Sequence, residues 1–154
     1  MVQTKIYITS DHAGFKLKEK LKKYLNSKGY TIKDFGPHKY NKNDDYPDFI
    51  IPLAKTVSKN KNKDTKGIIL GKSGQGEAIA ANKVKGIRAV VYYGGSLNII
   101  KLSRQHNNSN ILSLGAGFLS YQEAVKAVSL WLKTPFSNAP RHKRRLRKIE
   151  LLGK

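Results

Sequence analysis

The stretch Ile68–Glu77 reads IILGKSGQGE and passes from a short apolar run into a glycine-rich turn. The apolar run is rich in β-branched side chains and too short for an ordinary helix, so it predicts a buried strand. Glycines at positions 71, 74 and 76 predict a tight turn, and a helical pattern follows over Glu77–Asn82. A strand that leads through a tight turn into a helix is the building block of parallel α/β sheets.

The same alternation extends to both sides of this stretch. Short apolar runs predict four further strands, at Ile6–Ile8, Tyr30–Ile32, Ala89–Tyr92 and Ile111–Leu114. Helical patterns occupy Phe15–Ser27, Phe49–Val57, Leu97–Arg104 and Tyr121–Leu132, and Pro140 opens a basic last helix over about residues 140–150. We therefore predict a three-layer α/β/α sandwich, Rossmann-like, with a five-stranded parallel sheet, in a single domain over residues 1–154.

Composition limits the classes of function. Of the 154 residues, 39% are hydrophobic, which excludes a wholly disordered chain. There is no cysteine, and its absence excludes disulfides, cysteine zinc sites and thiol catalysis. No run approaches the ~20 apolar residues that cross a membrane, and the first apolar run is too brief for a signal peptide. We expect a soluble, cytoplasmic protein without a membrane partner.

The charge balance points to an anionic partner. The chain has 30 Lys and Arg against 10 Asp and Glu, a formal net charge of +20. Arg141 and Arg145 lie one helical turn apart, so both guanidinium groups can hold one phosphate. For this pair, a solvated basic tail or a nucleic-acid contact is the alternative. Nucleic-acid binding has little other support, because no RNP-like aromatic strand, Cys/His finger or glycine-arginine repeat is present.

Parallel sheets bind ligands beyond the carboxyl ends of their strands, which directs attention to the turn after Gly71. Its glycines let backbone amides close around an anion at a helix start. The sequence Gly-Lys-Ser at 71–73 resembles the end of a Walker loop, but that motif needs a glycine where Lys66 stands, so we exclude a nucleotide triphosphatase. Glu77 follows the turn, and it is either a catalytic carboxylate or a first-turn glutamate favoured by the helix dipole. The turn comprises Lys72, Ser73, Gly74, Gln75 and Gly76.

Two more candidates, Asp11 and His12, follow the first predicted strand. Asp11 can cap the helix that begins near Phe15, or it can belong to a site. The four histidines, at positions 12, 38, 106 and 142, show no i,i+4 ligand spacing with one another. We therefore expect no metal site.

Several motifs, in order along the chain, resemble one known family. They are Ser10–Lys18, Asp45–Asp48, Gly74–Gly76 with Ile79–Lys83, Gly86–Ala89, Leu102–Asn108 and Arg141–Arg145. Together they resemble the type B ribose-5-phosphate isomerases, a ribose/galactose isomerase family that includes galactose-6-phosphate isomerase subunits. The resemblance extends from about Ile6 to Ile149, nearly the whole chain.

The resemblance implies an enzyme of the pentose phosphate pathway that interconverts ribose 5-phosphate and ribulose 5-phosphate without metal or cofactor. It also implies an active site built between two subunits of a homodimer, or of a tetramer. By position, the resemblance implies that Asp11 and His12 are the substrate-binding pair and that Lys72–Gly76 form the anion loop. It implies that His106 is the acid that opens the sugar ring and that Asn107 binds the ligand. It also implies that Arg141 and Arg145 bind the phosphate.

The chain departs from the family pattern at two positions and in one segment. Many members carry a cysteine base at the position of Gly71, whereas this chain resembles the branch in which a glutamate, here Glu77, lies across the loop. The family usually has a phosphate-binding arginine where this chain has Gly117, so a neighbouring lysine would have to replace it. The segment Tyr92–Lys101 also differs from the family pattern.

An aldose–ketose isomerase must open the sugar ring, move a proton between adjacent carbons and stabilise an enediolate. We predict that His106 serves ring opening with Asp11 or His12 as a helper, and that Glu77 moves the carbon-bound proton. The amides of the glycine turn can stabilise the oxyanion. The alternatives are an isomerase of allose or galactose 6-phosphate, a catalytically silent sugar-phosphate-binding relative, and a basic nucleic-acid-binding protein.

Overall fold

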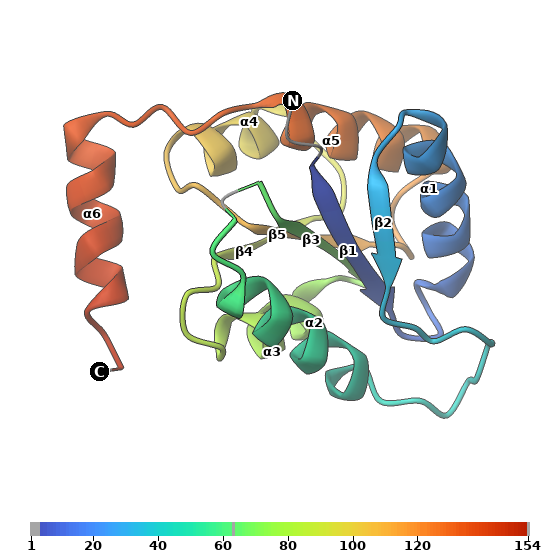
Figure 1. The fold of residues 1–154 in the computed structure, drawn as a ribbon. Helices are drawn as coiled ribbons and strands as arrows, with labels where there is room; N and C mark the ends of the chain where they lie inside the picture. The colour runs from blue at the N-terminus through green and yellow to red at the C-terminus, as the bar shows by residue number, and fades with distance from the viewer. Residues whose placement is uncertain (1–3, 63, 154) are drawn as a thin grey trace.

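The computed structural model describes residues 4–62 and 64–153. Its five strands are β1 (Lys5–Ser10), β2 (Thr31–Asp34), β3 (Lys66–Gly71), β4 (Ala89–Tyr92) and β5 (Ile111–Gly115). They form one sheet in the order β2-β1-β3-β5-β4, and every neighbouring pair is parallel (Figure 1). The predicted five-stranded parallel sheet is therefore confirmed.

Helices cover both faces of this sheet (Figure 1). They are α1 (Phe15–Ser27), α2 (Pro47–Lys59), α3 (Gln75–Asn82), α4 (Asn98–Gln105), α5 (Tyr121–Lys133) and α6 (Pro140–Glu150). Buried residues of α1, α4 and α5 share one apolar core, and those of α2 and α3 share another. Strand β3 serves both cores, because Ile68 and Leu70 face the first and Ile69 faces the second. This arrangement confirms the three-layer sandwich.

Several element boundaries differ from the predictions by one or two residues, and three of them have a clear physical reason. Helix α2 begins at Pro47 rather than Phe49, because proline has no amide hydrogen to leave unpaired in a first turn. Helix α3 begins at Gln75 rather than Glu77, since Gly74 has φ 78° and turns the chain into the helix there. Strand β2 is shifted toward Asp34, and as an edge strand with half-exposed residues it has a weak apolar pattern.

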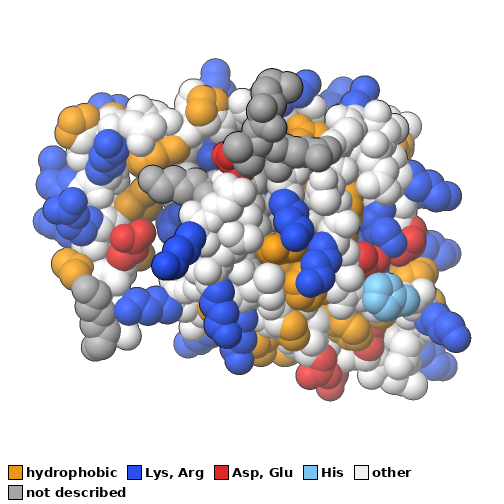
Figure 2. Space-filling model, in the orientation of Figure 1, with side chains coloured by type: hydrophobic (Ala, Val, Ile, Leu, Met, Phe, Trp, Pro, Cys, Tyr) orange, Lys and Arg blue, Asp and Glu red, His pale blue; other side chains and the backbone are white. Residues whose placement is uncertain are grey.

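The last helix, α6, stands apart from the sandwich at the end of an extended segment (Figure 1). Its buried side chains are His142 and Leu146, while Ile149 and Leu151 are each 55% exposed. Lys and Arg side chains are spread over the visible face of the molecule, including α6 (Figure 2). Among the residues described, no helix is long and apolar enough to cross a membrane.

Because all five strands run in one direction, the sheet has two chemically distinct edges. At the carboxyl edge the strands end, and the turns into α1 and α3 begin there. At the amino edge the strands begin, and the chain enters them from the preceding helices, as from α4 into β5. These two edges locate the candidate site residues.

Candidate active site

The glycine turn, residues 71–76, is fixed between the carboxyl ends of β3 and β5. The amides of Ala116 and Gly117 donate to the carbonyls of Gly71 (2.8 Å) and Lys72 (2.9 Å). The Ser113 hydroxyl donates to the Gly74 carbonyl at 2.6 Å, and a Cβ on Gly74 would lie 3.0 Å from that hydroxyl oxygen. The turn is therefore rigid, and it requires glycine at position 74 for both space and backbone angle.

The turn offers backbone donors to an anion. In the part of the chain that the structure describes, the amides of Ser73 and Gly74 have no hydrogen-bond partner. They stand at the N-terminus of α3, whose N-cap residue Gly74 provides no side-chain acceptor. These two amides therefore lie at the positive end of the helix dipole, where an anion would be favoured.

The carboxyl group of Glu77 occupies the space above Gly71. A Cβ on Gly71 would lie 1.7 Å from Glu77 Oε1 and 2.1 Å from its Cδ, so no side chain at position 71 can share this volume. Glu77 is only 5% exposed. Burial raises the pKa of the Glu77 carboxyl, and the charge of Asp11 raises it further. The sequence placed Glu77 near the turn, and the structure places its carboxyl over the end of β3.

Asp11 and His12 lie at the same edge, at the end of β1. Asp11 is 7% exposed, and its Oδ1 accepts a hydrogen bond from the Gly14 amide at 3.2 Å. It does not cap α1, because the N-cap residue is Gly14. Burial raises the pKa of the Asp11 carboxyl. The carboxyl edge therefore holds two buried carboxyl groups, from Asp11 and Glu77, and the charge of Asp11 contributes to the raised pKa of Glu77.

Asp44 joins this cluster, although none of the sequence motifs includes it. Its Oδ1 accepts a hydrogen bond at 2.6 Å from Nδ1 of His12. This contact raises the pKa of His12 above its ordinary value. The one signal that could have pointed to Asp44 is its position, directly before the Asp45–Asp48 motif.

The same three side chains could in principle hold a cation. One ligand atom each from Asp11, His12 and Asp44 lies within 4.8 Å of the others. The 2.6 Å contact between His12 Nδ1 and Asp44 Oδ1 is a hydrogen-bond distance, and a proton on Nδ1 competes with a metal ion. The geometry fits a hydrogen-bonded pair of His12 and Asp44 better than a metal centre.

Lys72 lies where a side chain on residue 117 would begin. A Cβ on Gly117 would be 3.1 Å from Lys72 Cγ and 3.1 Å from its carbonyl oxygen. The stem of Lys72 therefore crosses between the turn after β3 and the turn after β5. The family usually has an arginine at position 117, and in this chain the stem of a lysine lies beside that position.

The remaining predicted residues gather at the amino edge. His106 and Asn107 follow α4, and the His106 ring packs on the ring of His142 with centroids 4.2 Å apart. Burial and the neighbouring positive charges lower the pKa of His142. Arg141 and Arg145 flank His142 on α6, and both are exposed.

One chain therefore divides the candidate site between two edges of its sheet. The turn 72–76 with Asp11, His12 and Glu77 lies at the carboxyl edge, whereas His106, Asn107, Arg141 and Arg145 lie beyond the amino edge. Sequence motifs alone gave no indication of this separation within a single copy.

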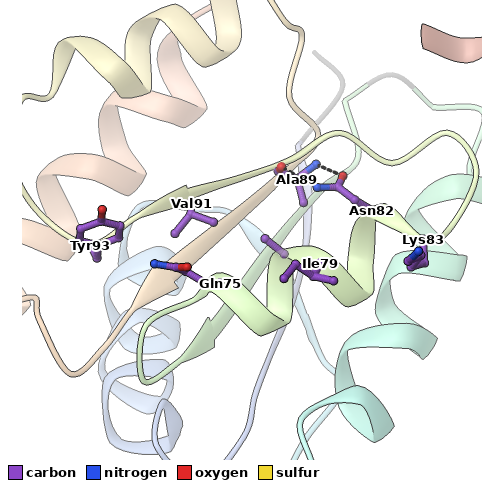
Figure 3. Close-up of a pocket in the computed structure, with 8 residues that line it drawn as sticks. Gln75, Ile79, Asn82, Lys83, Ala89, Val91 and Tyr93 are labelled. Atoms are coloured by element: carbon purple, nitrogen blue, oxygen red, sulfur yellow. Dashed lines mark hydrogen bonds between the residues drawn. The ribbon is translucent and has the colours of Figure 1, made fainter.

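An open groove adjoins the carboxyl-edge cluster, between α3 and the edge strand β4 (Figure 3). Its volume is about 540 Å³. Asn82 fixes one end by exchanging two hydrogen bonds with the backbone of Ala89, at 2.8 and 3.0 Å (Figure 3). Ile79 and Tyr93 border the groove and are 64% and 51% exposed. Exposed apolar side chains so close to the cluster indicate a contact surface.

Comparison with known proteins gives consistent similarities. The family model described as Ribose/Galactose Isomerase matches residues 6–149. Ribose-5-phosphate isomerase B of Mycolicibacterium paratuberculosis is 41% identical over 143 residues, covering 92% of this chain and 87% of the relative. A probable ribose-5-phosphate isomerase B of Mycoplasma genitalium is 42% identical and covers 94% of this chain and 92% of the relative.

Solved structures are similar as well. The ribose-5-phosphate isomerase B of Mycoplasma genitalium with bound ribulose-5-phosphate superposes with a TM-score of 0.89 at 40% identity, covering 95% of this chain and 93% of that chain. The enzyme of Clostridium thermocellum gives a TM-score of 0.87 at 40% identity, with 95% of each chain covered.

Proposed function

The chain belongs to the ribose/galactose isomerase family, and from this premise we propose that it interconverts ribose 5-phosphate and ribulose 5-phosphate through an enediolate. One observation carries the proposal: the buried Glu77 carboxyl lies over Gly71, beside an anion-binding turn and near Asp11. The ribulose-5-phosphate in the Mycoplasma genitalium structure supports the choice of substrate.

The carboxyl edge supplies the proton transfer. Glu77 removes the proton from one substrate carbon and returns it to the adjacent carbon, and its raised pKa makes it a stronger base once it is ionised. The enediolate that forms in between carries negative charge on oxygen. The amides of Ser73 and Gly74 can donate to that oxygen, which is the task of an oxyanion hole.

The amino edge supplies ring opening and phosphate binding. His106 exchanges protons with the ring oxygen and the anomeric hydroxyl, and Asn107 contacts the sugar. Arg141 and Arg145 hold the phosphate, so binding energy from this remote group orients the reacting carbons.

A homodimer brings the two halves together in this proposal. The amino-edge residues of one copy complete the carboxyl-edge cluster of the other. The apolar groove between α3 and β4 supports such a contact, as do Ile79, Tyr93 and Phe118, which are 64%, 51% and 60% exposed beside it or near it.

A coupled assay tests the substrate. Ribose 5-phosphate, allose 6-phosphate and galactose 6-phosphate are offered separately to the purified protein, and the appearance of each ketose is followed. We expect the highest kcat/KM with ribose 5-phosphate. A preference for either hexose phosphate would reassign the substrate, and turnover of none of the three would favour a silent sugar-phosphate-binding relative.

Mixing two inactive variants tests the shared site. Glu77→Gln and His106→Asn are each expected to be nearly inactive as pure proteins. A mixed dimer contains one site with both changes and one site with neither, so random mixing should restore about a quarter of wild-type activity. No recovery after mixing, with exchange of subunits verified by mass, would place both residues in the site of one chain.

A further inference from the structure

Asp44 holds His12 at two points. Its Oδ1 accepts hydrogen bonds from the His12 backbone amide at 3.1 Å and from Nδ1 of the ring at 2.6 Å. The two residues are 32 positions apart in sequence, so the contact joins the loop before α2 to the end of β1. With Nδ1 engaged, the second ring nitrogen, Nε2, makes no hydrogen bond within residues 4–62 and 64–153.

The surroundings of the pair favour a charged ring. The Asp44 side chain is 6% exposed and that of His12 is 33% exposed. Asp44 Oδ2 is buried and has no hydrogen-bond partner among the described residues. A buried carboxylate with an unpaired oxygen needs a counter-charge close by, and the His12 imidazolium is the group in contact with it.

One further charged group near His12, Asp11, acts in the same direction as Asp44. Asp11 adds a second negative charge, and the Tyr40 ring packs edge-on against the imidazole at 6.2 Å. Together with the Asp44 hydrogen bond, the Asp11 charge raises the pKa of His12, while partial burial opposes them. The Asp11 charge also raises the pKa of the Glu77 carboxyl, so the same carboxylate acts on both groups.

We propose that Asp44 is a positioning residue of the isomerase, which keeps His12 as an imidazolium with Nδ1–H on the carboxylate and Nε2–H available to a substrate oxygen. The proposal rests on the proposed function for the identity of the ligand, but the pairing itself does not. A charged donor of fixed direction binds an oxygen more strongly than a neutral and mobile ring. Asp44 thereby contributes to binding without touching the substrate.

The first test measures the ring itself, without substrate. NMR titration of the imidazole signals is carried out on wild type and Asp44→Asn, with the His12 signals assigned from a His12→Gln variant. Asp45→Asn is the matched control, because its exposed carboxylate is next in sequence and does not contact His12. We expect the His12 pKa to fall in Asp44→Asn and to stay unchanged in Asp45→Asn. An unmoved pKa in Asp44→Asn would overturn the pairing.

The second test measures whether the reaction uses the protonated His12 ring. A donor that must be protonated makes kcat/KM fall as pH rises through its pKa, so this falling limb should move to lower pH in Asp44→Asn. On the limb, each pH unit of displacement corresponds to a roughly tenfold loss of kcat/KM at fixed pH. If kcat/KM of Asp44→Asn falls by the same factor at every pH, the role of Asp44 is structural and the proposal is overturned.

Two further outcomes separate the possible failures. If the NMR shift is found but the wild-type chain turns over no sugar phosphate, the proposed function fails and the ion pair stands. If Asp44→Asn does not fold, Asp44→Ser repeats both measurements, since it removes the carboxylate with a smaller side chain. An alkaline limb that persists at the same pH in His12→Gln would also overturn the proposal.

Discussion

At the scale of single residues, Glu77 carries the proton transfer in the proposed reaction. Glu77→Gln keeps the size of the side chain and removes the base, so kcat should fall by about a hundredfold or more with little change in KM. Solvent-deuterium incorporation into the substrate, followed by NMR, should fall in parallel. Glu19→Gln on the outer side of α1 is the control, because among the described residues Glu19 pairs with Lys18 and Lys22 and with no group of the candidate site. Exchange at the wild-type rate in Glu77→Gln would assign the base to another group, with Asp11 next.

Gly71 leaves room for that carboxyl group, which gives a second test. In Gly71→Ala the new methyl would collide with the Glu77 carboxyl, the movable end of a side chain, rather than with backbone. We expect a large loss of kcat with only a small change in Tm. The loss should disappear in a Glu77→Ala background, because the two changes act on the same group. Additive losses in the double variant would contradict this interpretation.

Lys72 and Gly117 form a pair with a testable exchange. We expect Lys72→Met to raise KM about tenfold, because it removes one charge-assisted contact to the phosphate. Gly117→Arg alone should bring little gain, since the Lys72 stem lies within 3.1 Å of the new Cβ. In a Lys72→Gly background the same arginine should restore affinity for inorganic phosphate, measured by calorimetry. Tighter binding from Gly117→Arg alone would show that the two side chains do not compete.

At the scale of elements, α6 carries Arg141 and Arg145, the two arginines proposed to hold the phosphate. Arg141→Ala and Arg145→Ala should each raise KM roughly ten- to a hundredfold, the equivalent of ~1.5–3 kcal/mol for a charge-assisted contact. Lys143→Ala is the control, because residue 143 is exposed on another side of the helix. Unchanged kinetics in both arginine variants would mean that this helix does not bind the substrate phosphate. It would then be a solvated basic segment or a nucleic-acid contact.

Most elements could be predicted because their signals are local. The run before Gly71 is apolar and short, and all six residues of β3 are indeed buried. The start of α3 was misplaced because the left-handed Gly74 is a backbone feature that a list of residue types does not reveal. The partner of His12 was missed for a similar reason. Asp44 is 32 residues away from His12, and only the folded loop brings them together.

At the scale of the whole molecule, the separation of the site over two edges of the sheet calls for a second copy. Light scattering should therefore give a mass of at least twice the 17.3 kDa of one chain. Specific activity should fall on dilution toward the dissociation constant, because a lone chain lacks half of each site. A fully active monomer would contradict both the dimer and the shared site.

The sequence could suggest candidate site residues but not their grouping. A motif gives the position of a residue in the sequence. The edge of the sheet at which that residue lies depends on whether it follows or precedes the neighbouring strand. Glu77 follows β3 and His106 precedes β5, which places them apart in one chain. A parallel sheet had been predicted, so this consequence was within reach, but the strand order and the contact between two copies were not.

The volume above Gly71 has a consequence for inhibition. Relatives that carry a cysteine there present a thiol to the sugar, and a reagent that alkylates it would inactivate them. This chain has no cysteine, and its carboxyl group already fills that volume. The two chemical solutions exclude each other in space, so neither can be reached from the other by one substitution. An electrophile aimed at the thiol form should spare this enzyme, whereas a compound that hydrogen-bonds to a carboxylate at this point should select it.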